Sequence, residues 1–180
     1  MNFAAGEDKM NGGQKVSTRC GVGRIFHISV ILMLAFMSHQ AAAQSSGLID
    51  ATKPERILEF AKGFGLAELE QDSSGDPRIT GRLDGKRYTI FFYGCKQNVN
   101  CTDIQFWAYW PAAQSPGLSA VNDWNQQKRF GKASLDRDGD LIFRMPVNIR
   151  HGVSSKNLED SFVWWQAALR GFIKDVVKQN

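Results

Sequence analysis

Apolar and polar positions follow one of two periods over most of the chain. A period of two is typical of strands, and a period near 3.6 is typical of helices. The pattern predicts a helix over 49–64, strands over 66–71, 78–83, 86–93 and 102–110, a helix over 118–130, strands over 132–136 and 141–149, and a helix over 158–178. We therefore expect an α+β domain in the order α-ββββ-α-ββ-α, an antiparallel sheet with its helices on one face.

The last predicted helix is the most regular element. Its apolar residues recur at steps of three or four and form one stripe, which is typical of a helix face buried against a core. These residues are Leu158, Phe162, Trp165, Leu169, Phe172 and Val176. The helix over 118–130 places Leu118, Val121, Trp124 and Phe130 on one side, and we expect that side to face the core as well.

Two neighbouring strands carry apolar residues on both faces. One face is predicted to hold Tyr88, Ile90, Phe92, Ile104, Phe106 and Ala108. Because side chains alternate along a strand, Phe91, Tyr93, Trp107 and Tyr109 then share the opposite face. A solvated sheet face rarely carries so much aromatic surface. Either a helix or loop covers this face, or another chain docks on it.

Residues 24–44 are typical of a secretory signal peptide. The apolar run over 25–37 is too short for a membrane-spanning helix, basic residues precede it, and small residues at 41–43 suit a signal peptidase. We expect a signal peptide over 1–43 that begins at Met1 or Met10 and is cleaved after Ala43, a linker over 44–52 and a single domain over 53–180. The mature protein is then periplasmic or secreted from a bacterium, with no stable membrane span.

Export changes both the charge and the cysteine content. The leader holds four basic and two acidic residues, so the formal charge falls from +4 to +2 on cleavage. Charges of both signs are spread along the mature chain, which argues against a nucleic-acid partner. Cys95 and Cys101 are the two cysteines left, and they lie between two strand patterns. We predict that they form a structural disulfide across a hairpin loop, because a redox or metal site lacks its usual spacing here.

The predicted mature chain offers little catalytic chemistry. It has one histidine, His151, and lacks the G-x-S-x-G, glycine-rich phosphate-loop and H-E-x-x-H motifs. The acidic turn over 136–140 does not have the spacing of an EF-hand loop. We predict no catalytic, cofactor or metal site. The alternative is a small periplasmic hydrolase that uses His151 with Asp136, Asp138 or Asp140.

Several short motifs stand out along the chain. They are Pro77-Arg-Ile-x-Gly-x-Leu-Asp-Gly-x-x-Tyr88, Asn122-Asp-Trp-Asn125, Arg129-Phe-Gly-Lys-Ala133, Asp136-Arg-Asp-Gly139 and Gly152-Val-Ser154. Together these motifs resemble the YbjN-like family of bacterial sensory transduction regulators. The resemblance covers about residues 50–177. It implies a fold similar to the type III secretion chaperones, which tend to dimerise and bind extended polypeptide. Pro146 and His151 depart from the family pattern, and Pro146 suggests an edge strand or a bulge.

Together these observations predict an exported, non-enzymatic binding or regulatory protein. We expect a monomer or homodimer that holds a polypeptide or a partner domain, either on the aromatic sheet face or beside the last helix. The predicted partner-binding residues are Phe91, Tyr93, Trp107, Tyr109 and Trp164. A structural component of the cell envelope is a further alternative.

Overall fold

The computed structural model describes residues 47–177, so the predicted signal peptide lies outside the described residues. The elements are α2 (Pro54–Gly63), β1 (Ala67–Gln71), β2 (Pro77–Leu83), β3 (Lys86–Tyr93), β4 (Asp103–Trp110), η2 (Ala112–Gln114), α3 (Leu118–Gln127), β5 (Lys132–Leu135), β6 (Leu141–Asn148), α4 (Ser155–Phe172) and a π-helical turn (Ile173–Val177). The predicted order of helices and strands is confirmed. No helix in this part of the chain is long and apolar enough to span a membrane.

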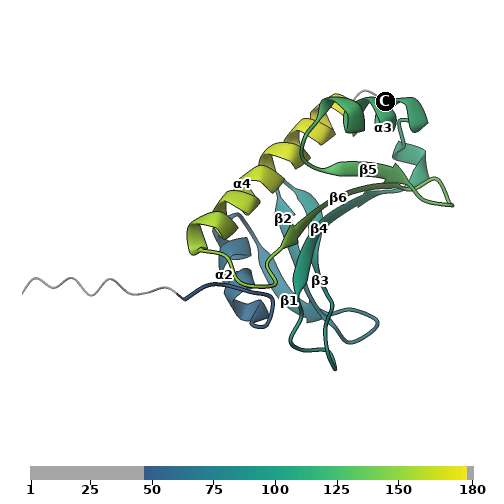
Figure 1. Ribbon diagram of the computed structural model, residues 1–180. Helices are drawn as coiled ribbons and strands as arrows, with labels where there is room; N and C mark the ends of the chain where they lie inside the picture. The colour runs from purple at the N-terminus through teal and green to yellow at the C-terminus, as the bar shows by residue number, and fades with distance from the viewer. Residues whose placement is uncertain (1–46, 178–180) are drawn as a thin grey trace, which may run out of the picture. The chain divides into compact units, whose positions relative to one another are not determined.

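The six strands form one antiparallel sheet in the order β1-β2-β3-β4-β6-β5. Helices α2, α3 and α4 all lie on the same side of it (Figure 1). This is the predicted α+β arrangement, with the core between the sheet and the helices.

Aromatic rings fill most of this core. Every residue of the predicted α4 stripe is buried. The rings of Phe106 and Trp165 stack with centroids 5.3 Å apart, and those of Phe143 and Phe172 stack at 4.2 Å. Phe162 meets Phe106 edge-on at 4.9 Å. The contacts join two central strands to the whole length of α4, so this helix is held firmly against the sheet.

Two helices begin at different residues from those predicted. The first begins at Pro54 rather than 49, because Ile49 instead forms an isolated β-bridge with Val153. Their backbone N–H and C=O groups exchange hydrogen bonds of 2.8 and 2.9 Å. The last begins at Ser155 rather than 158, since the Ser154 hydroxyl accepts a 3.1 Å hydrogen bond from the N–H of Asn157 and caps it.

The second helix begins at Leu118 as predicted, but it ends earlier than predicted and Leu118 does not face the core. Leu118 is the first residue of α3, lies beyond the part that packs on the sheet, and is 72% exposed, whereas Val121 and Trp124 are buried as predicted. The helix ends at Gln127 because Lys128 is extended. Phe130 therefore lies in the following loop.

Cys95 and Cys101 form the predicted disulfide across the β3–β4 loop. Inside the ring, Lys96 and Val99 pair as an isolated bridge. The Asn98 side chain donates a 2.8 Å hydrogen bond to the carbonyl of Ser74, in the β1–β2 turn. The disulfide loop is thereby fixed against the neighbouring turn at this end of the sheet.

Pro146 lies where β6 has a free side. Strand β6 pairs with β4 along its full length, but β5 covers only Leu141–Arg144. Pro146 pairs with Gln105 of β4 and points its ring nitrogen away from that strand. The position confirms the predicted edge location, because proline has no N–H to give to a neighbour.

Two titratable residues of β3 lie on the helix-facing side of the sheet. The Lys86 ammonium lies 3.8 Å from the centroid of the Trp110 ring and donates to the carbonyl of Tyr109. Partial burial lowers the pKa of Lys86 to about 8. Burial raises the pKa of Tyr88 to about 12. Both shifts make the free energy of unfolding depend on pH above neutrality.

We expect stability to rise from pH 7 to about 9.5 and then to fall. Between the folded and unfolded pKa values of Lys86, the unfolded chain binds more protons, so raising the pH favours the folded state. Above about pH 10 the unfolded chain loses the Tyr88 proton first, and the effect reverses. Solvent screening of the half-exposed Lys86 reduces the rise to about 1 kcal/mol.

Urea unfolding at pH 7 and pH 9.5 measures this dependence. Lys86→Met should abolish the rise, because the ammonium that deprotonates is gone. Lys132→Met, which removes an exposed lysine of β5, should retain it. A profile that is flat over this range in the unchanged protein would contradict the assignment to Lys86.

Candidate binding surface

Four aromatic side chains form a row on the sheet face opposite the helices, which we call the open face. They are Phe91 and Tyr93 of β3 and Trp107 and Tyr109 of β4. Phe91 meets Trp107 edge-on with ring centroids 5.8 Å apart, and Trp107 stacks on Tyr109 at 5.7 Å. Tyr93 is 47% and Tyr109 38% exposed. Within residues 47–177 no helix covers this aromatic row.

Hydrogen bonds fix both ends of the aromatic row. The Tyr109 hydroxyl donates a 2.6 Å hydrogen bond to Asp140 Oδ2, which raises the pKa of Tyr109. At the other end, the Gln105 amide donates a 3.2 Å hydrogen bond to the Tyr93 hydroxyl. Rings held in this way lose little conformational freedom when a partner binds.

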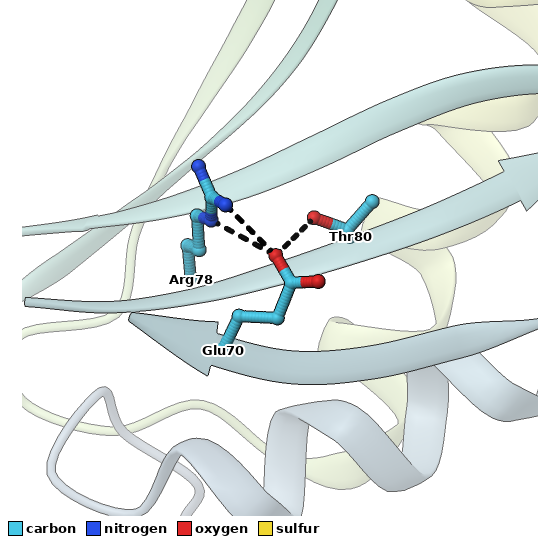
Figure 2. A network of polar contacts seen from close by, with 3 residues as sticks. All are labelled: Glu70, Arg78 and Thr80. Atoms are coloured by element: carbon cyan, nitrogen blue, oxygen red, sulfur yellow. Dashed lines mark hydrogen bonds and ion pairs between the residues drawn. The ribbon is translucent and has the colours of Figure 1, made fainter. Parts of the chain in front are cut away.

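A hollow of about 500 Å³ lies between the aromatic row and β1. On its rim, Glu70 Oε2 accepts hydrogen bonds from Arg78 Nε at 3.0 Å and from the Thr80 hydroxyl at 3.1 Å (Figure 2). This network pairs Glu70 with Arg78. Arg82 and Arg87, which also line the hollow, form no ion pair among the described residues.

Cations also flank the other side of the aromatic row. Arg144 of β6 lies directly opposite Trp107, and Lys132 of β5 lies opposite Arg144. The sequence analysis did not single out these cations or Arg82 and Arg87. The alternation of side chains along each strand could have identified them, because it places all four on the same face as the aromatic row.

Trp164 does not belong to the open face. It lies on α4, in the helical layer on the other side of the sheet, and is 43% exposed. Its ring packs on Phe130 with centroids 4.3 Å apart, and its Nε1 donates a 3.0 Å hydrogen bond to Asp160. The structure therefore divides the five predicted partner-binding residues into a row of four and one separate tryptophan.

The geometry does not support the hydrolase alternative. His151 is exposed and follows the end of β6, whereas Asp136, Asp138 and Asp140 lie in the turn before its start. A strand of this length separates the two ends by about 25 Å, well beyond hydrogen-bond reach. His151 thus has no partner among the three predicted acids.

The acidic turn before β6 uses its carboxylates locally. Asp136 Oδ1 accepts hydrogen bonds from the backbone N–H groups of Asp138 and Asp140, at 3.0 and 2.9 Å. Asp140 binds Tyr109 and the N–H of Ala112. Over the described residues, no group of three or more His, Cys, Asp or Glu side chains is placed to hold a metal ion.

A family model, YbjN, described as "Putative bacterial sensory transduction regulator", matches residues 53–177. The chain belongs to the YbjN family. The match includes all six strands and the three helices, so the open face is part of the YbjN domain. The family description is that of a regulatory protein. No curated protein matched the chain.

Among solved structures, the chain is similar to the Yersinia pestis type III secretion chaperone SycH, determined in complex with a stable fragment of YscM2. The two are 19% identical, and the match covers 66% of this chain and 98% of the SycH chain with a TM-score of 0.40. This is the class of chaperones that the family resemblance implied.

Proposed function

We propose that this YbjN protein is a non-catalytic binding protein that holds a segment of another polypeptide on the open face of its sheet. The observation that carries the proposal is the row of Phe91, Tyr93, Trp107 and Tyr109 on the face that the helices leave bare. Aromatic side chains contribute most of the binding energy in many protein interfaces. The regulatory description of the family is in accord with a binding role.

The flanking charges support a polypeptide rather than a small apolar ligand. Arg82 and Arg87 border the aromatic row on one side, and Arg144 and Lys132 border it on the other. Arginine and aromatic residues together are typical of protein-binding surfaces. The open face is also a broad surface rather than an enclosed cavity, which suits an extended or flat partner.

We further propose that the protein acts outside the cytoplasm, in the periplasm or after secretion from a bacterium. The leader over 1–43 supports export, and the Cys95–Cys101 disulfide suits an oxidising compartment. A mature chain that begins at Gln44 is the corresponding expectation, and the intact mass of the protein purified from its own cells tests it.

Replacing Trp107 and Tyr109 with serine should abolish partner binding. Loss of an interface aromatic costs about 2 kcal/mol, which is about thirtyfold in Kd for each residue. Native mass spectrometry of the protein purified gently from its own cells, compared with its denatured mass, measures the bound polypeptide. The unchanged protein should carry a second polypeptide, and the Trp107→Ser/Tyr109→Ser variant should not.

Trp164→Ser is the matched control, because it removes an exposed tryptophan from the opposite side of the molecule. This variant should keep its partner, and circular dichroism should show that both variants are folded. Equal loss of the partner in both variants would contradict a role for the open face. A discrete homodimer with no other polypeptide would identify a second copy as the occupant and overturn the proposal.

A further inference from the structure

The two edge strands of the sheet differ in how their outer sides are satisfied. At β5, a side chain from α3 takes the place of a neighbouring strand. Asn125 Nδ2 donates to the carbonyl of Ala133, and Asn125 Oδ1 accepts from the N–H of Ala133, both at 2.9 Å. A side-chain amide carries the same donor and acceptor as a peptide group. Asn125 therefore closes the outer edge of β5 at the centre of this short strand.

At the opposite edge, the backbone of β1 forms no hydrogen bond on its outer side with any other part of residues 47–177. Two hydrogen bonds bracket the strand, from Arg82 N–H to the Leu66 carbonyl at 2.9 Å and from Asp72 N–H to the Asp76 carbonyl at 2.8 Å. Alternate residues of an antiparallel strand face the same neighbour. Counted from these bonds, the backbone N–H and C=O groups of the even-numbered residues of β1 point toward β2. Those of the odd-numbered residues point away from the sheet.

The outward residues are Ala67, Leu69 and Gln71. No hydrogen bond within residues 47–177 uses the outward N–H of Leu69 or Gln71. Exposed strand edges of this kind are templates for another strand. An extended peptide presents donors and acceptors at the same spacing of two residues, and few other ligands do.

A hollow of about 430 Å³ is lined in part by the second half of β1. Its lining includes Leu69 and Gln71 of β1, Pro77 of β2, Thr52 and Glu55, and Asn98–Cys101 of the disulfide loop. The free backbone of β1 thus adjoins space for a short stretch of extended chain. The disulfide loop, held to the β1–β2 turn by Asn98, keeps that space fixed.

Charge at the edge distinguishes between possible occupants. Glu68 and Glu70 both point to the open face from β1. In a two-fold dimer joined through β1, each register that pairs Leu69 with Ala67, Leu69 or Gln71 of the other copy sets a glutamate opposite a glutamate. Like charges in that position are destabilising. Glu68 has no ion pair among the described residues, so it is free to meet a cation.

We propose that β1 accepts an extended segment of a partner polypeptide as an additional strand, and that this segment alternates basic and apolar residues. Its basic side chains lie beside Glu68 on the open-face side. Its apolar side chains lie beside Leu69, on the side that faces α2. The proposal goes beyond binding at the aromatic row, because it concerns the backbone edge of the sheet and stands if the row binds nothing.

The test uses a short capped peptide that alternates valine and lysine, with the isotope-labelled mature protein. Hydrogen exchange followed by NMR should slow by about tenfold or more at the amides of Leu69 and Gln71 when the peptide is saturating. A matched peptide with glutamate in place of lysine should give no protection. In Glu68→Lys the preference between the two peptides should reverse. Trp107→Ser/Tyr109→Ser should bind the lysine peptide as the unchanged protein does, which separates this site from the aromatic row.

Equal protection of these amides by the lysine and glutamate peptides would overturn the proposal. It would also be overturned if, without any peptide, the Leu69 amide became protected as the protein concentration is raised, because a second copy would then occupy the edge. The β5 edge supplies a second check. In Asn125→Ala the same lysine peptide should also protect the amide of Ala133, because its closing side chain is gone. Protection of Ala133 in the unchanged protein would overturn the assignment of β1 as the open edge.

Discussion

Replacing Gly131 with alanine is expected to lower the free energy of unfolding by about 3–5 kcal/mol. Gly131 has a φ of +74°, a conformation that alanine adopts only with strain. A Cβ atom at this position would also lie 2.0 Å from Cζ of Phe143. That ring cannot retreat easily, because it stacks on Phe172 with centroids 4.2 Å apart.

The reason for this close approach is the fixed course of the loop after α3. The Trp124 indole donates a 3.0 Å hydrogen bond to the carbonyl of Gly131 and holds the loop against the core. Alanine must therefore either displace the Phe143 ring or break this bond. Both changes disturb the aromatic centre of the protein.

Gly85→Ala is the matched control, since Gly85 has a φ of +81° and the added Cβ would have no neighbour from residues 47–177 within 4 Å. It should cost only the backbone strain, about 1 kcal/mol. Urea unfolding of both variants measures the difference. Equal losses at the two sites would show that the contact with Phe143 is not what makes Gly131 necessary.

Phe106→Ala should cost about 3–5 kcal/mol, whereas Trp107→Ala, one residue further along β4, should cost about 1–2 kcal/mol. Phe106 is fully buried between the sheet and α4, where it contacts Phe162 and Trp165. Trp107 is larger, but both of its aromatic partners, Phe91 and Tyr109, lie on the open face. The smaller residue is therefore expected to contribute more to stability.

Urea unfolding of the two variants tests this expectation. The result also bears on the proposed function, because a tryptophan that contributes little to folding is free to contribute to binding. Ile142→Ala, on the open face of β6, should resemble Trp107→Ala rather than Phe106→Ala. A loss at Trp107 as large as at Phe106 would show that the open face is part of the folded core.

The sequence predicted the strands, the α4 stripe and the faces of β3 and β4 because each depends on a local period. Phe106 and Trp107 could be assigned to opposite faces from alternation alone. Alternation does not say which face the helices cover, so two outcomes for the second face stayed open. The structure decides this within the described residues, by placing α2, α3 and α4 together on one side.

Contacts between distant residues account for what the sequence did not predict. Trp164 is adjacent to a buried stripe residue, and only the packing of α4 shows that it points away from the sheet. The bridge between Ile49 and Val153 joins segments about a hundred residues apart and shortens the first helix. Asn125 gives no sign of its contact with Ala133, because asparagine at a helix end is also common in turns and caps.

The differing edges of the sheet set a limit on how far it can grow. Asn125 forms hydrogen bonds with the outward backbone groups of Ala133 and so closes the outer side of β5. Strand β6 extends past the end of β5 on the same side, and there Pro146 has no N–H to donate. A sheet with two available sides can stack copy after copy into a fibre. With a single available side, one addition terminates the process. Over residues 47–177 the sheet thus exposes backbone for recognition at one edge, while its other edge gives no place for a further strand.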